Sequence, residues 1–363
     1  MKLLNQNSKT SKNNFVYFLI LFLSFLTFIF LNREKLFQKF NPEVVDKYLR
    51  SQDILDKKNI IKDRIFVSDE EIYIASGYLY TNGSGPTEYN FQHPPFIKYL
   101  FGISARYLNL PLLPNVFFAG LLLLEVYLMG KLVFKSELIG LLSSLLLLFD
   151  PVFKEVTIYA LLDLGQMVFI LGFILTTFFW KKHWIGQGVL LGLAIASKFY
   201  SPVVIFLGII YMYKILTKQF EFKKEVLMLV VVLITFALTY TIAFVKGDFN
   251  FFFYQAKIIK FMLDHNQAIE WGGVIKMFFG GYLLWPILFF VNMYLLFKTK
   301  FSDPVFIFSM IPIIYFCVLC FQLPFTRYFI LILPFLYLSS GNFLVNKIAR
   351  SCHVAVGKIN GVR

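Results

Sequence analysis

The sequence predicts an all-α polytopic membrane protein with about ten (9–11) transmembrane helices. Of the 363 residues, 58% are hydrophobic, and the mean hydropathy of +0.69 is higher than a soluble core requires. Several apolar runs approach or exceed the ~20 residues that a helix needs to cross a bilayer. Lysines and arginines gather in the segments between these runs, as the topology of a helical membrane protein requires.

The apolar runs give the order of the expected spans. The run at 15–31 follows three lysines, as in a signal peptide, but it is long for one and no small-residue cleavage site follows it. We therefore expect an uncleaved first span there. The remaining spans are expected near 116–134, 138–149, 158–180, 184–197, 202–216, 226–245, 281–297, 305–322 and 327–346.

The segments outside the spans are not simple linkers. Residues 32–62 alternate charged and apolar positions, a pattern that suits a helix lying at the membrane interface. Residues 94–110 are expected to form a second such helix or a short span, and 246–280 suit an interfacial loop or lid. The expected organisation is one transmembrane domain at 1–348 with outer segments at about 32–115 and 246–280, then a short basic cytoplasmic tail at 349–363.

The distribution of basic residues predicts the orientation of the chain. If the N-terminus is cytoplasmic, the inner segments hold 17 of the 35 lysines and arginines, whereas the short outer loops hold three. Both termini are then cytoplasmic, and the net charge of +14 reflects topology rather than nucleic-acid binding. Polar residues then collect on the extracytoplasmic face, as in an active site there: Asp69, Glu70, His93, Asp150, Glu155, Lys198, His265 and Arg327, with Asp163 a turn or two inside.

Several short motifs follow one another along the chain and point to a family. In order they are Asp69-Glu70-x-x-Tyr73, Gln92-His93-Pro94-Pro95-x-x-Lys98, Phe149-Asp150-Pro151 with Asp163 further on, Gly188 to Lys198-Phe199, Trp285-Pro286, and Arg327-Tyr328-Phe329. Together they resemble the dolichyl-phosphate-mannose protein mannosyltransferases and their bacterial and archaeal relatives, within the GT-C class of membrane glycosyltransferases. The resemblance covers about residues 66 to 340. It departs at Gln92, where relatives often carry an acidic residue.

The resemblance implies a GT-C fold and an inverting transfer of a sugar, first of all mannose, from a polyprenyl- or dolichyl-phosphate carrier to a protein Ser/Thr hydroxyl. Because a phosphate leaves, the reaction needs no acid; it needs one base for the acceptor proton and cations for the phosphate. Asp69 is the expected base, with Glu70 orienting it or the acceptor. Lys198 and Arg327 are expected at the carrier phosphate. The other expected substrate-binding residues are His93, Lys98, Asp163, His265 and Tyr328.

No cofactor is expected besides the lipid-linked donor, and the expected partners are membrane lipids and a protein or lipid acceptor. The sequence has no convincing cluster of metal ligands, although a divalent ion held by Asp69, Glu70 and Asp163 stays open. The three cysteines give no disulfide framework. Cys317 and Cys320 lie in an apolar run, where they suit helix packing.

Three alternatives stay open. In the first, the acceptor is a lipid or a cell-surface glycan, as for the aminoarabinose transferases of lipid A, because acceptor choice lies in variable outer loops. In the second, the protein is a polyprenyl-lipid transporter, which predicts paired repeats and ionisable residues near mid-membrane; only Glu125 lies there. The third is a catalytically inactive relative, since Ile158 stands where many relatives have an arginine.

Overall fold

The computed structural model describes residues 2–53, 65–180, 183–265 and 272–360. Within these ranges, side chains are not described at 2–14, 251–252, 261–262, 265 and 348–360. The described residues form helices and no strand, with one isolated bridge between Ser51 and Ile65. The all-α class predicted from the sequence is confirmed.

The helices follow the predicted order. They are α1 (Lys2–Leu31), α2 (Arg33–Leu36), α3 (Glu43–Leu49), α4 (Asp69–Thr81), α5 (Phe96–Ile103) with the π-helical turn η1 (Ser104–Leu108), α6 (Leu113–Leu132), α7 (Glu137–Leu148), α8 (Pro151–Ile158), α9 (Leu162–Phe179), α10 (Trp184–Ser197), α11 (Tyr200–Leu216), α12 (Phe222–Leu238), α13 (Thr241–Val245), α14 (Phe251–His265), α15 (Gly273–Gly280), α16 (Leu284–Lys298), α17 (Pro304–Leu319), the 3₁₀ turn η3 (Thr326–Leu331) and α18 (Leu333–Asn360).

Each of the predicted apolar segments overlaps a helix, and the one at 226–245 is divided between α12 and α13. Among the described residues, α6 and α9 are long and apolar enough to cross a membrane by themselves. The pair α15 and α16, bent by 102°, passes the same test together, as a broken span or a re-entrant loop. The apolar part of α1, with α7, α10, α11 and α17, forms shorter apolar helices of 10–17 residues. The chain is a helical membrane protein, as predicted.

Small residues let the helices of the bundle approach closely. A Cβ atom added to Gly130 of α6 would lie 2.2 Å from the Cα atom of Gly140 in α7. A Cβ atom on Gly77 of α4 would lie 2.0 Å from the carbonyl oxygen of Lys98 in α5. Contacts of this kind are typical of helix packing in membranes, where close van der Waals packing replaces the hydrophobic effect. At the centre of the bundle, α9 is buried over most of its length.

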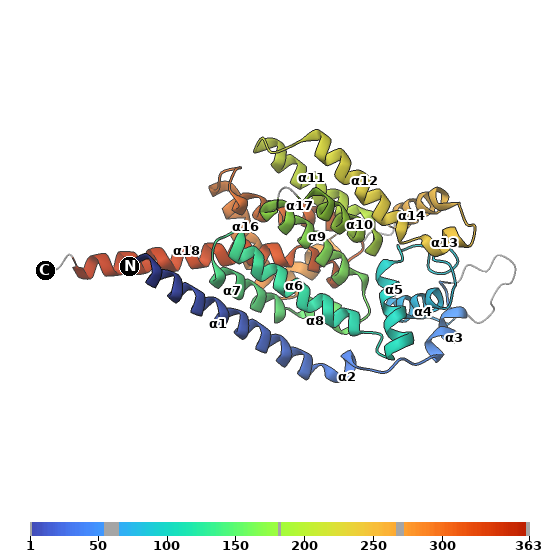
Figure 1. Ribbon diagram of the computed structural model, residues 1–363. Coiled ribbons are helices and arrows are strands. Elements are labelled where there is room, and N and C mark those ends of the chain that lie inside the picture. The colour runs from blue at the N-terminus through green and yellow to red at the C-terminus, as the bar shows by residue number, and fades with distance from the viewer. Residues whose placement is uncertain (1, 54–64, 181–182, 266–271, 361–363) are drawn as a thin grey trace.

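The two ends of the bundle differ in what they carry. In Figure 1, α3, α4, α5, α13 and α14 gather at the right end, whereas the N- and C-terminal ends of α1 and α18 lie at the left end. Both termini therefore lie at the end opposite to the polar segments that the sequence singled out.

Three predicted spans begin later than expected, and the one at 281–297 begins at Leu284. The span predicted at 158–180 begins at Leu162, because Tyr159 and Leu161 have extended backbone and separate α9 from α8. The span predicted at 327–346 begins at Leu333, after η3. Its helix then continues to Asn360, without a break at the predicted start of the tail.

The first outer segment also differs from the prediction. In place of one helix over 32–62 it contains the short α2 and α3, and 54–64 lie outside the described residues. The helix α4 was not predicted, although the sequence contains a signal for its start. Ser68 Oγ accepts from the Glu71 amide, and the Glu71 carboxylate accepts from the Ser68 amide. This reciprocal capping box fixes the start of α4 at Asp69.

Candidate active site

Four charged side chains meet at the polar end of the bundle and form the charged network. Arg327 Nη2 donates to Asp69 Oδ2 at 2.5 Å, and Arg327 Nε lies 3.9 Å from Asp163 Oδ2. Lys198 Nζ donates to the other Asp163 oxygen, Oδ1, at 2.5 Å. The order Asp69–Arg327–Asp163–Lys198 alternates in sign and sums to zero charge. The network brings together residues from four separate elements.

Each member of the network lies at an end of its element. Asp69 and Asp163 lie in the first turns of α4 and α9, where the helix dipole favours a negative charge. Lys198 follows the last residue of α10, and Arg327 lies in η3. Helix ends at one face of a bundle can thus place both signs of charge together without burying them at mid-membrane.

Exposure separates the two carboxylates. The Asp163 side chain is 2% exposed and that of Lys198 is 5% exposed, so these two form the buried base of the network. The Asp69 side chain is 40% exposed. Asp69 is therefore the carboxylate of the network that an incoming molecule can reach.

Tyrosines line the network. The Lys198 ammonium lies 4.5 Å from the centroid of the Tyr328 ring, within range of a cation–π contact. Burial raises the pKa of Tyr328 to about 12, and Asp163 adds to this shift. Burial, followed by the charge of Asp69, raises the pKa of Tyr73 well above its usual range. Both hydroxyls therefore stay protonated near neutral pH and can donate hydrogen bonds.

Burial opposes the charge of Arg327, but Asp163, Tyr73 and Asp69 outweigh it and raise the pKa of Arg327. The guanidinium therefore stays charged near neutral pH. The planar guanidinium can donate hydrogen bonds to two carboxylates at once in a fixed geometry, which an ammonium group does less well. Arg327 is the link between the exposed Asp69 and the buried Asp163.

Glu70 lies outside the network, although it follows Asp69 in the sequence. Neighbouring residues on a helix point in different directions, and Glu70 Oε2 accepts from Lys35 Nζ at 3.2 Å. It lines a separate cleft of about 310 Å³ with three lysines, Lys35, Lys39 and Lys47. The structure therefore does not bring Asp69 and Glu70, the predicted catalytic pair, to the same partner or cleft.

Lys98, expected to bind substrate, is fully buried, and its ammonium is directed at its own loop. Its ammonium donates to Asn90 O at 2.7 Å, to Asn90 Oδ1 at 3.0 Å and to His93 O at 2.8 Å. It therefore joins the loop before α5 to that helix and does not face the charged network. Burial lowers the pKa of Lys98 to about 7, while Asp53 opposes the shift.

His93 lies beside the network rather than in it. Its ring centroid is 5.4 Å from that of Tyr73 and 4.4 Å from that of Phe199, next to Lys198. His265 is the last residue of α14, and its side chain lies outside the described residues.

Among the described residues, no group of three His, Cys, Asp or Glu side chains is placed to hold a metal ion. The three carboxylates considered from the sequence do not converge. Asp69 and Asp163 both face Arg327, and Glu70 faces Lys35. The geometry therefore favours ion pairing over metal binding at these positions.

Asp150, in the third motif, has a supporting position. It caps α8, accepting from the Val152 amide at 2.7 Å. Its other oxygen accepts from Trp285 Nε1 at 2.7 Å and from the Tyr337 hydroxyl at 2.5 Å. Trp285 is 2% exposed and held inside the protein. The motif thus fixes α8 against α16 and α18.

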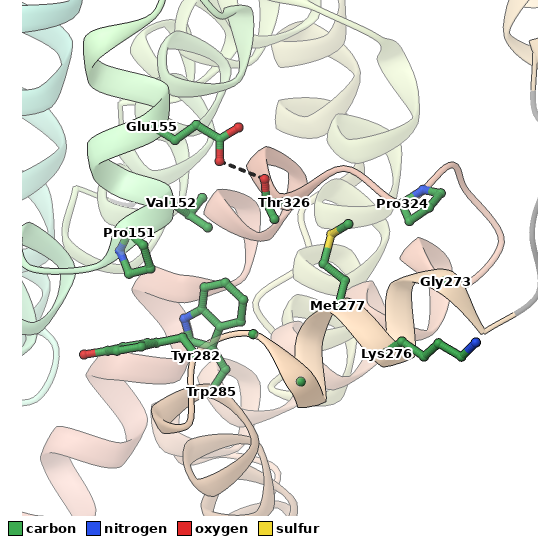
Figure 2. Close-up of a pocket in the computed structure, with 12 residues that line it drawn as sticks. Pro151, Val152, Glu155, Gly273, Lys276, Met277, Tyr282, Trp285, Pro324 and Thr326 are labelled. Atoms are coloured by element: carbon green, nitrogen blue, oxygen red, sulfur yellow. Dashed lines mark hydrogen bonds between the residues drawn. The ribbon is translucent and has the colours of Figure 1, made fainter.

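Sequence reasoning missed a cavity of about 690 Å³ that shares η3 with the network. Figure 2 shows residues of α8, α15, the start of α16 and η3 around this cavity. Glu155 accepts from the Thr326 hydroxyl at 2.7 Å across it. Glu155 was placed on the outer face from the sequence, but nothing in its surroundings there distinguished it. The partner Thr326 is 171 residues away, so only the fold reveals the pair.

Two solved structures share the arrangement of helices. A crystal structure of ArnT from Cupriavidus metallidurans bound to undecaprenyl phosphate matches with a TM-score of 0.63 and 16% identity, over 87% of this chain and 59% of its own. The apo state of ArnT from the same organism matches with a TM-score of 0.58 and 17% identity, over 76% of this chain and 54% of its own. The chain has the GT-C fold.

The GT-C class implied by the sequence motifs is therefore confirmed at the level of fold. The chain spans about 59% of the length of the ArnT chain it matches. No protein-family model matches the chain, and no curated protein matches it either. Within the GT-C fold, the charged network lies where α4, α9, α10 and η3 meet.

Proposed function

We propose that the protein is an inverting glycosyltransferase that takes a sugar from a polyprenyl-phosphate carrier and transfers it to a hydroxyl on its acceptor. The charged network carries this proposal, because it gathers an exposed carboxylate and two cations at one end of a GT-C fold. The bound undecaprenyl phosphate of the matching ArnT structure supports a polyprenyl phosphate as the carrier.

The residues of the network fit the steps of this reaction. The acceptor oxygen forms a bond to the anomeric carbon, and the bond from that carbon to the phosphate oxygen breaks with its electron pair leaving on the phosphate. Asp69 takes the acceptor proton, for which its exposure suits it. Arg327 and Lys198 hold the phosphate through charge-assisted hydrogen bonds.

Asp163 keeps the two cations in place when no phosphate is bound. It pairs with Lys198 and lies 3.9 Å from Arg327, so neither cation is left buried and uncompensated. An arriving phosphate then replaces part of this pairing, and the Tyr73 and Tyr328 hydroxyls can donate to it.

An apolar cleft in the structure suits the prenyl chain of the carrier. An apolar cleft of about 400 Å³ is lined by Phe96, Leu100, Phe118, Phe169 and Leu193 among others, and its rim exposes Ile103, Leu108 and Phe117. Leu193 lies on α10, five residues before Lys198, which follows the end of that helix. Five residues correspond to a rise of about 8 Å along a helix axis. A prenyl chain in this cleft would leave its phosphate near the charged network.

For the sugar and acceptor we propose mannose and a protein Ser/Thr hydroxyl first, on the motifs that resemble protein mannosyltransferases. Transfer to a lipid or a cell-surface glycan is the second candidate, and the ArnT-like fold favours it about equally. The basic residues between the spans support an extracytoplasmic site and a cytoplasmic N-terminus.

The test is a transfer assay with the purified protein in lipid nanodiscs. It receives radiolabelled polyprenyl-phosphate-mannose with a Ser/Thr-rich peptide, or with a membrane lipid and glycan extract. The native chain should move label to one acceptor fraction, and Asp69→Asn should not. No transfer to either fraction by well-folded native protein would overturn the enzymatic proposal, and full transfer by Asp69→Asn would overturn the assignment of the base.

A further inference from the structure

The cavity between α8, α15 and η3 has the size of a small-ligand site. Its volume of about 690 Å³ lies inside the ~300–1,000 Å³ range of such sites. Its walls come from segments far apart in the sequence, with Val152 and Glu155 on one side and Met277 on another. Figure 2 shows these side chains surrounding an opening rather than filling it.

The lining of the cavity combines aromatic, carboxylate and backbone surfaces. Trp285 is held rigidly by Asp150, and Tyr282, 37% exposed, meets it edge-on with ring centroids 5.9 Å apart. Gly280 and Gly281 leave the backbone beside these rings without side chains. Glu155 and the Thr326 hydroxyl supply polar groups at the end nearest η3.

The charges of the lining do not favour an anionic ligand. Glu155 and Lys276 both line the cavity, and Figure 2 shows the Lys276 side chain extending away from Glu155. A phosphate in the cavity would therefore meet a carboxylate and one lysine, whereas the charged network offers it two cations. The carrier phosphate therefore belongs at Arg327 and Lys198, not here.

The lining suits a neutral ligand with one apolar face and several hydroxyl groups. Aromatic side chains present a large apolar body with a polar edge, against which the C–H face of a sugar ring packs. A carboxylate accepts strong hydrogen bonds from hydroxyl groups. A prenyl chain has no hydrogen-bond donor for Glu155, and the cleft beside Phe96 and Phe169 is more apolar.

The cavity and the charged network are adjacent through two consecutive residues of η3. Thr326 donates to Glu155 on the cavity side, and Arg327 donates to Asp69 on the network side. A ligand seated against Thr326 therefore lies beside the residue that is next in the chain to Arg327, the partner of Asp69. This makes the cavity a candidate place for the acceptor that Asp69 deprotonates.

We propose that this cavity binds a neutral saccharide ring of the acceptor, which selects the second of the two acceptors named above, a glycan or the sugar headgroup of a lipid, over the Ser/Thr hydroxyl that the motifs alone put first. The inference rests on the proposed function, because it names the acceptor of that reaction. Glu155 binds the acceptor hydroxyls, and Tyr282, packed against the buried Trp285, forms the apolar wall.

Binding is measured without a donor, so that it does not depend on catalysis. Saturation-transfer NMR is recorded on the protein in nanodiscs with mannobiose, with N,N′-diacetylchitobiose and with a Ser/Thr-rich peptide as separate probes. We expect saturation of the ring protons of at least one disaccharide. Glu155→Gln, which can still accept from Thr326, and Tyr282→Ala should each weaken binding about tenfold, the loss expected for a hydrogen bond to a charged group or an aromatic contact.

The controls separate this inference from the proposed function. Tyr294→Ala removes an exposed tyrosine at the other end of α16 and should leave binding unchanged. Asp69→Asn should abolish transfer and retain disaccharide binding. Binding of the peptide alone, or disaccharide binding that survives both cavity variants, would overturn the inference. Disaccharide binding without transfer by the native chain would instead overturn the proposed reaction and leave the saccharide site standing.

Discussion

Arg327 and Asp69 lie 258 residues apart in the sequence and form a hydrogen-bonded ion pair at 2.5 Å. The pair joins η3 to the first turn of α4. The same guanidinium lies 3.9 Å from Asp163, which Lys198 also binds. A change at Arg327 therefore acts on the exposed carboxylate and on the buried ion pair at once.

Arg327→Lys is expected to lower sugar transfer by about 100-fold, or about 2.7 kcal/mol of transition-state stabilisation. A lysine ammonium can meet Asp69 or Asp163 but not present a fork to both. The measurement is the rate of label transfer from polyprenyl-phosphate-mannose at saturating acceptor. Arg33→Lys changes an exposed arginine outside the network and should keep the native rate. A native rate in Arg327→Lys would show that the fork geometry is not used.

The buried pair of Lys198 and Asp163 gives a second prediction, on stability. Lys198→Met leaves the 2% exposed Asp163 with Arg327 alone, and losing one partner of a buried pair costs about 3 kcal/mol or more. The apparent Tm in nanodiscs should fall by about 5 °C or more. Adding Asp163→Asn removes the uncompensated charge, so the double variant should be more stable than Lys198→Met alone. Additive losses would show that the two side chains do not interact.

The sequence was sufficient for most of the helices and for the four members of the charged network. Apolar runs and basic loops located the helical spans, because burial in lipid constrains every residue of a span. The motifs singled out Asp69 in the first outer segment and Asp163, Lys198 and Arg327 at or near the ends of expected spans. Their pairing was not predictable, because it depends on how α4, α9, α10 and η3 meet in space.

The residues that sequence reasoning misplaced show the same limit. Glu70 follows Asp69, but its direction depends on where the capping box starts α4. Lys98 was expected to face the cleft, yet three oxygens of its own loop surround its ammonium. Neither the direction of a side chain nor the cavity at Glu155 follows from local pattern alone.

The glycine contact between α4 and α5 gives a third prediction. A methyl group on Gly77 would lie 2.0 Å from the Lys98 carbonyl oxygen, so Gly77→Ala must push the two helices apart and cost about 1–3 kcal/mol. Because α4 carries Asp69, transfer should also fall. Gly208→Ala is the matched control, since nothing lies within 4 Å of the added atom in α11. That variant should be as stable as the native chain, or more stable by up to about 1 kcal/mol. Equal melting temperatures for both variants would contradict the close approach.

Lys98, in α5 and outside the candidate spans, gives a prediction for pH. Burial lowers its pKa to about 7, whereas an unfolded lysine has a pKa of about 10.4. Between these values the unfolded chain binds more protons than the folded chain, so the contribution of Lys98 to stability rises with pH from about 7 to 10. The difference in apparent Tm between the native chain and Lys98→Met should therefore grow over this range. A difference that stays constant or shrinks with rising pH would mean that the buried lysine keeps its proton.

The neighbouring carboxylates Asp69 and Glu70 give the sharpest test of the active site. Asp69 faces Arg327 in the charged network, whereas Glu70 faces Lys35 in another cleft. Asp69→Asn should abolish transfer, because an amide cannot take the acceptor proton. Glu70→Gln should retain transfer within about threefold, because the pair with Lys35 is partly exposed and contributes ~1 kcal/mol or less.

Both variants keep the side-chain volume and the start of α4, so the comparison isolates the carboxylate charge. The readout is initial transfer rate at several donor concentrations, which separates kcat from KM. Lys35→Met should follow Glu70→Gln if the two residues act as a pair. Loss of transfer in Glu70→Gln with retention in Asp69→Asn would reverse the assignment and place the reacting hydroxyl in the lysine-lined cleft of Lys35, Lys39 and Lys47.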